Sequence, residues 1–137
     1  MKALLHERYG SPNDLRMAEV DRPTAEEGQV LVRVRASSVN AGDWRRVRAK
    51  PWLVRTSAGW RRPKSPLFGA DAAGVVEAVG PEVTDLRVGD EVMGIRSGAF
   101  AEYVAGANFV PKPANATFEH LVGFQMSQDQ LRYNATR

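Results

Sequence analysis

The hydrophobic and polar residues of this chain follow the short, alternating pattern of β-strands. The clearest strand is predicted at 29–36, where Val32 and Val34 point to one face and Arg33 and Arg35 to the other. A β-branched face opposite a charged one predicts a sheet that is covered on one side and wet on the other. Further short extended segments are predicted at 1–6, 15–20, 75–79, 91–93, 99–104 and 108–111.

Turns rich in glycine and proline separate these segments, which predicts a mainly β domain, either a barrel or a sandwich. A helix is predicted at 118–126 after Thr117, because Phe118, Leu121 and Val122 fall on one helical face. The polar residues 127–137 show no pattern, and we expect them to fray.

The composition narrows the possible chemistry. A length of 137 residues fits one domain, and 43% hydrophobic with 26% charged residues is ordinary for a globular protein. The absence of cysteine excludes disulfides, thiolate catalysis and cysteine-ligated zinc. His6 and His120 have no acidic partner at a metal-ligand spacing, so we expect structural or exposed roles and no metal site. With no spanning segment and no signal peptide, the expected location is cytoplasmic, away from any membrane.

The net charge of +3 is unevenly distributed. No acid occurs between Trp44 and Ala70, where three tryptophans are interleaved with basic residues. This stretch admits three interpretations: a solvated loop whose tryptophans pack on the domain, a surface that faces a phosphate, or a nucleic-acid surface. Of these, nucleic-acid binding is the least favoured. The basic residues are Arg45, Arg46, Arg48, Lys50, Arg55, Arg61, Arg62 and Lys64.

A cluster of small residues at 69–74 precedes the strand predicted at 75–79. Small residues beside a buried strand indicate that another surface, a packed neighbour or a ligand, approaches the backbone. Gly69 and Gly74 have the wrong spacing for a pyrophosphate turn, and no G-x-G-x-x-G, P-loop or G-x-S-x-G motif occurs. Nothing in the chain can therefore be shown to bind a whole dinucleotide.

The residues 69–80 (GADAAGVVEAVG) and 88–92 (VGDEV) together resemble the N-terminal GroES-like domain of the medium-chain dehydrogenases/reductases. The resemblance is strongest to their zinc-free quinone oxidoreductase (zeta-crystallin-like) branch. It implies a GroES-like, partly open β-barrel with short helical turns and a C-terminal helix.

The resemblance divides the chain into a substrate-side domain at 1–117 and a helix and polar tail outside the family pattern at 118–137. In the family a Rossmann domain of roughly 150 residues follows. Because this chain lacks one, we expect a truncated member. The sequence does not distinguish a natural truncation from a frameshift or an artificially shortened chain.

The resemblance also implies a site without zinc. Zinc alcohol dehydrogenases have a cysteine where this chain has Asn40, and a histidine–glutamate pair where it has Ala70 and Asp71. The zinc-free branch has the asparagine and the acid, here Asn40 and Asp43. By resemblance, Asn40, Asp43 and Asp71 belong to the substrate and nicotinamide pocket, and no catalytic nucleophile is needed because hydride transfer is the cofactor's chemistry. The loop at the cleft mouth begins with Trp44, Arg45 and Arg46.

Each of these residues also has a structural alternative. Asn40 can satisfy backbone groups at the end of its strand. Asp43 can cap a helical turn at 44–48, line the pocket, or do both. Asp71 can be held by hydrogen bonds inside the barrel.

The resemblance implies the substrate-side domain of a zinc-independent, NADPH- or NADH-dependent reductase of quinones, enones or related carbonyl compounds. We expect the chain alone to be inactive and to bind the cofactor weakly. One alternative is a non-catalytic module that uses loop 44–64 to bind nucleic acid or a protein. Another is a decayed gene product that self-associates through an exposed apolar face on the helix at 118–126. The acceptor, the cofactor preference and the oligomeric state are left open.

Overall fold

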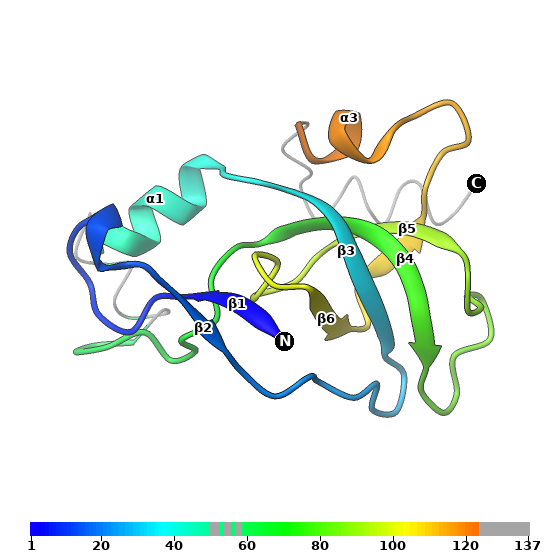
Figure 1. Cartoon of the computed structure of the whole chain (residues 1–137), viewed down its shortest axis with the longest axis horizontal. Helices are drawn as coiled ribbons and strands as arrows, with labels where there is room; N and C mark the ends of the chain where they lie inside the picture. Colours follow the sequence, from blue (N-terminus) through cyan, green and yellow to red (C-terminus); the bar gives the residue numbers. More distant parts are fainter. Residues whose placement is uncertain (50–52, 54–55, 57–58, 124–137) are drawn as a thin grey trace.

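The chain folds into two antiparallel sheets flanked by short helices (Figure 1). The computed structural model describes residues 1–49, 53, 56 and 59–123. One sheet pairs β1 with β2, and the other has the strand order β6-β3-β4-β5-β7. The predicted mainly β fold is confirmed, and the strands of the described residues form no closed barrel. The strands are β1 (Lys2–Leu5), β2 (Arg16–Glu19), β3 (Val30–Ser38), β4 (Asp71–Val79), β5 (Glu91–Ile95), β6 (Tyr103–Gly106) and β7 (Phe109–Pro111). The helices are η1 (Pro12–Asp14), α1 (Ala41–Arg48) and α3 (Phe118–Gly123).

The main core lies on the inner face of the five-stranded sheet. Val30 and Val32 of β3 enter it at alternate positions, as the sequence pattern predicts, because successive strand residues face opposite sides. The isolated bridges Ala3–Ala101 and Leu5–Leu67 join β1 to the rest of the domain. The buried members of this core are Val30, Val32, Ala72, Val76, Leu86, Val92, Ala99, Val104 and Phe109.

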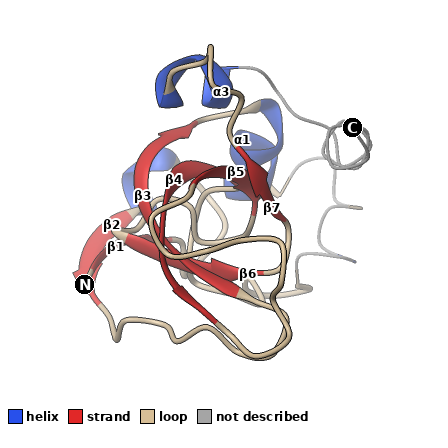
Figure 2. Ribbon diagram, turned by 90° about the vertical axis from the view of Figure 1, so that its right-hand side faces the viewer, coloured by secondary structure: helices blue, strands red, loops and turns tan. Residues whose placement is uncertain are grey.

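The outer face of the same sheet is not wet along its whole length, so that prediction is wrong in part. Helix α3 lies across this face (Figure 2) and contacts β3, β4 and β5. A second core forms there from Ala73, Met93 and Val122, with Phe118 and Leu121 packed against it. The expectation of an exposed apolar face on this helix is therefore wrong for its described residues.

A β-bulge in β3 separates residues that pack against the inner core from a residue that packs against the outer core. Two steps of β3, from Val34 to Ala36, lie opposite a single step of β4, so Arg35 is the additional residue. A bulge of this kind reorients the side chains that follow it. Val34 accordingly packs against the inner core, whereas Ala36 packs against the outer one.

The glycines at 69 and 74 are explained by atoms that lie close to the backbone. A Cβ atom on Gly74 would lie 2.1 Å from the carbonyl oxygen of Arg33, on the adjacent strand. Gly69 has a φ of +92°, and a Cβ atom there would lie 2.6 Å from the Phe100 ring. The surface that approaches this backbone is therefore a packed neighbour. Strand β4 already begins at Asp71, four residues before the predicted start.

Two further element starts differ from the prediction. Strand β6 begins at Tyr103 rather than at 99, because the preceding residues pair only through the single bridge at Ala101. Helix α1 begins at Ala41, three residues before the predicted turn. The predicted helix residues 124–126 and the tail 127–137 lie outside the described residues. Among the residues that are described, no helix is long and apolar enough to cross a membrane.

Candidate functional site

The junction of β3 and α1 is held by a reciprocal capping box. The Asn40 Oδ1 atom accepts the backbone N–H groups of Gly42 and Asp43, at 2.7 and 3.2 Å. In return, Asp43 Oδ2 accepts the backbone N–H of Asn40 at 3.0 Å. Three backbone N–H groups at the start of the helix thereby gain side-chain acceptors. The sequence alternative in which Asp43 is the cap of this helix is corrected: Asn40 is the N-cap, and Asp43 is the third helical residue.

Asp71 joins the same network from the start of β4. Asn40 Nδ2 donates to Asp71 Oδ2 at 2.7 Å, and the Ser38 hydroxyl lies 3.3 Å from the same oxygen. The Ser37 hydroxyl donates to the Asp71 carbonyl oxygen at 2.6 Å. The structure thus brings Asn40, Asp43 and Asp71 together. Ser37 and Ser38 were missed by sequence reasoning, because their role depends on the pairing of Ser38 with Asp71 between strands.

The carboxyl group of Asp43 lies in an unusual environment. Its residue is 2% exposed, and burial raises its pKa above the ordinary value. The negative charge of Asp71 acts in the same direction, while the Asn40 N–H and the positive charge of Arg46 oppose it. Among the described residues, no group of three histidine, cysteine, aspartate or glutamate side chains could hold a metal ion.

Asp43 also lines a cavity of about 560 Å³ between α1, the N-terminal segment and the aromatic residues Phe68 and Phe100. Its floor is deeply buried: Asp43, Val47 and Phe68 are each at most 3% exposed. At the rim, Val39 is 73% and Trp44 49% exposed. The full lining comprises Leu4, Pro12, Leu15, Val39, Asp43, Trp44, Val47, Arg48, Phe68 and Phe100. Asn40 and Asp71 are not among these residues, so Asp43 alone joins the polar network to the cavity.

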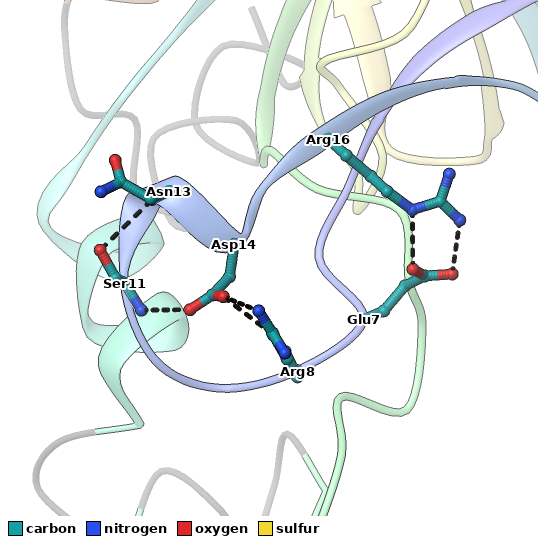
Figure 3. A network of polar contacts seen from close by, with 6 residues as sticks. All are labelled: Glu7, Arg8, Ser11, Asn13, Asp14 and Arg16. Carbon is teal, nitrogen blue, oxygen red and sulfur yellow. Dashed lines mark hydrogen bonds and ion pairs between the residues drawn. The ribbon is translucent and has the colours of Figure 1, made fainter.

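Figure 3 shows a polar network in the N-terminal segment, which contributes Pro12 and Leu15 to the cavity lining. Asp14 accepts the Ser11 N–H at 2.9 Å and is paired with Arg8. Arg16 makes a two-point contact with Glu7 at 2.8 and 2.9 Å. These contacts lower the pKa of both carboxyl groups, chiefly through the Ser11 N–H for Asp14 and through Arg16 for Glu7.

His6 packs against Phe68, which lines the cavity. It is 1% exposed, and its ring meets Tyr9 and Phe68 edge to face, at centroid distances of 5.7 and 5.6 Å. Within the described part of the chain, its Nε2 atom has no hydrogen-bond partner. Burial lowers the pKa of His6, and nearby Arg46 lowers it further. The structural role expected for this histidine is confirmed, and His120 is exposed as the other alternative expected.

The residues predicted at the cleft mouth, Trp44, Arg45 and Arg46, lie in different places. Trp44 lines the cavity, and the guanidinium carbon of Arg48 lies 5.3 Å from the centroid of its ring. Arg46 lies away from the cavity lining and reaches Ser97 Oγ at 3.4 Å, while Arg45 is exposed. The prediction that the tryptophans pack on the domain is wrong for Trp60, which is 67% exposed, and holds only in part for Trp44, which is 49% exposed. Residue 52, the third tryptophan, lies outside the described residues.

Comparison with known proteins shows that the chain is similar to oxidoreductases. Residues 26–114 match the family model described as "Alcohol dehydrogenase GroES-like domain". The chain is 38% identical over 124 residues to the trans-enoyl reductase BOA5 of Botryotinia fuckeliana, covering 82% of this chain and 30% of that protein. It is 35% identical over 112 residues to the quinone oxidoreductase of Lama guanicoe, covering 79% and 32%.

A solved structure has the same fold. The mycobacterial protein Rv1454c in complex with NADPH matches with a TM-score of 0.77 and 28% sequence identity, over 92% of this chain and 38% of that one. The present chain thus spans about a third of the length of these relatives.

Proposed function

The chain belongs to the medium-chain dehydrogenases/reductases through its alcohol dehydrogenase GroES-like domain, and we propose that it forms the acceptor-binding side of an NAD(P)H-dependent reductase. The acceptor class is quinones, enones or related carbonyl compounds. Its relatives include a quinone oxidoreductase and a trans-enoyl reductase. The domain in this proposal is residues 1–117, with α3 docked on its outer face.

The observation that carries the proposal is the buried carboxyl group of Asp43 on the floor of an apolar cavity. Apolar walls with few convergent polar groups are typical of small-molecule sites. Val47 and Phe68 offer apolar contacts to the body of an uncharged acceptor. The raised pKa of Asp43 favours its protonated form, whose O–H can donate a hydrogen bond to a carbonyl oxygen.

Asn40 and Asp71 lie outside the cavity lining and would act on the acceptor through Asp43. The Asn40 side chain holds the first turn of α1, and its amide donates to Asp71, so the orientation of Asp43 depends on both. We assign these two residues a positioning role. No step in this proposal requires zinc.

Among the described residues, the glycines at 69 and 74 offer no open backbone to a dinucleotide phosphate. The positions beside Gly69 and Gly74, where a phosphate would need open backbone, are filled by Phe100 and by the Arg33 carbonyl. Hydride transfer is the chemistry of NADPH or NADH in this family. We therefore assign this chain no cofactor step, and we expect weak binding of NADPH and no turnover by the chain alone.

The exposure of Trp44 and Trp60 also suits stacking on single-stranded nucleic acid, the alternative left open by the sequence. The cavity beneath Trp44 favours a small molecule instead, because an open stacking platform needs no enclosed apolar floor.

Titration of the labelled chain with cyclohex-2-en-1-one, followed by amide NMR shifts, tests the proposal. We expect the shifts to cluster at Asp43, Trp44, Val47 and Phe68, and to weaken in the variant Asp43→Leu. Shifts confined to other surfaces, or oxidation of NADPH by the chain alone with the enone, would contradict it.

A further inference from the structure

Among the described residues, the cavity has at its rim a positive charge, that of Arg48, without an acidic partner. Asp43 and Arg48 are the ionisable residues among its lining. Asp43 is buried and accepts the Asn40 N–H, whereas Arg48 is exposed. In the described part of the chain, the contact recorded for the Arg48 guanidinium is the face of Trp44. The charge that remains available to a ligand is therefore positive.

No ion pair between Arg48 and an acid is formed by the described residues. From Trp44 to Ala70 the sequence contains no acidic residue. In the N-terminal segment, outside the cavity lining, Glu7 is engaged by Arg16 and Asp14 by Arg8. The rim of the cavity is thus complementary to an anion.

The depth of the cavity adds a second requirement. Val47 and Phe68 form a floor that is at most 3% exposed, and Phe100 extends it. An apolar group gains by leaving water here, whereas an anion placed on the floor would lose hydration next to the Asp43 carboxyl. A ligand that satisfies both parts has its apolar body inside and its anionic end at the rim.

We propose that this cavity binds an amphiphilic anion, with an aliphatic chain or ring on Val47 and Phe68 and a carboxylate or phosphate monoester at Arg48. As a statement about the substrate, the inference rests on the proposed function. It then specifies an acceptor that has an anionic group several bonds from its carbonyl. Binding itself requires no cofactor and no turnover.

Calorimetric titration of the full chain with decanoate, decyl phosphate and decan-1-ol tests the inference. We expect at least one of the two anions to bind about tenfold more tightly than the alcohol, and the stronger of them identifies the anionic group. The variant Arg48→Gln is expected to abolish this preference while it leaves the affinity for the alcohol unchanged. High salt is expected to reduce the same preference, because the rim is exposed.

The matched control is Arg22→Gln. Arg22 also stacks on an aromatic ring, 3.8 Å from the centroid of Tyr103, but it lies outside the cavity lining, so the affinities for all three probes should remain. A cavity-narrowing variant, Leu15→Trp, should weaken all three.

Equal binding of alcohol and anions to the wild-type chain overturns the inference, as does an unchanged preference in Arg48→Gln or no binding of any probe. The enone titration is read separately. If decanoate binds while the enone does not, the acceptor proposal fails and the anion site stands. If the enone binds while neither anion does, the anion site fails and the acceptor proposal stands.

Discussion

Asp43 has two roles that are set by one position. As the third residue of α1 it completes the capping box, and as part of the cavity floor it is removed from water. The Asn40 N–H favours the charged carboxylate, but burial favours the neutral acid and is the larger effect, so the pKa is raised. Asn40 lacks this conflict, because its neutral amide can accept from α1 and donate to Asp71 at the same time.

The raised pKa of Asp43 predicts a pH-dependent effect of Asp43→Asn. The folded chain binds this proton more tightly than the unfolded chain, so the stabilisation is present at low pH and is lost as the pH rises through the folded pKa. Asparagine keeps an oxygen acceptor without the charge. We expect the free energy of unfolding of the variant, relative to wild type, to be higher at about pH 7 than at about pH 4. Urea unfolding of both proteins at each pH measures this, and a constant or reversed difference would contradict it.

At the scale of elements, the pair β3–β4 determines the shape of the sheet. The close approach of the two strands requires glycine at 74. Because of the bulge at Arg35, the residues of β3 before it pack against the inner core and Ala36 after it packs against the outer core. The pairing of Ser38 with Asp71 at the end of these strands then places the capping box beside β4. The site network is a consequence of strand register.

The substitution Gly74→Ala tests this close approach. A Cβ atom 2.1 Å from a backbone carbonyl cannot be accommodated without separating the strands, so we expect a loss of about 2 kcal/mol or more in the free energy of unfolding. The control Gly28→Ala has open space around the new atom and a φ of +68°, and should cost about 1 kcal/mol from backbone strain alone. Denaturant unfolding compares the two, and equal costs would show that strand contact at Gly74 is not the cause.

At the scale of the whole molecule, the five-stranded sheet separates two cores. The inner core holds the domain together, and α3 closes one end of the outer face over Ala73 and Met93 (Figure 2). The cavity lies elsewhere, between α1 and the segment that follows β1. Binding in the cavity and docking of α3 therefore use different surfaces.

Detaching α3 is expected to expose the outer core. Val122→Asp places a charge in a site that is 9% exposed, and we expect it to destabilise the chain by about 3 kcal/mol and to promote self-association through the uncovered sheet face. His120→Asp introduces the same residue at an exposed position of the same helix and should have little effect on either property. Denaturant unfolding and sedimentation velocity measure the two properties, and matching behaviour of the two variants would contradict this role of α3.

Local pattern was sufficient for the strands and for the family. The alternation of valine and arginine at 32–35 reflects contacts that repeat at every second residue, so it can be recognised from the chain alone, whereas the buried start of β4 at Asp71 shows no such alternation and was missed. The same holds for the choice of Asn40, Asp43 and Asp71, which followed from residue types aligned with a known family. The start of β6 could not be predicted, because residues 99–102 alternate like a strand but pair through a single bridge.

By itself, the sequence determined a mainly β domain, its family and the three polar residues of the network. Tertiary structure decided that Asn40 is the helix cap, that Asp43 alone of the three reaches the cavity, and that the outer sheet face is covered by α3. The physical reason is the distance along the sequence over which each interaction acts. Periodicity and turn chemistry act between near neighbours, whereas a cap, a cavity wall and a covered face depend on residues that only register and packing bring together.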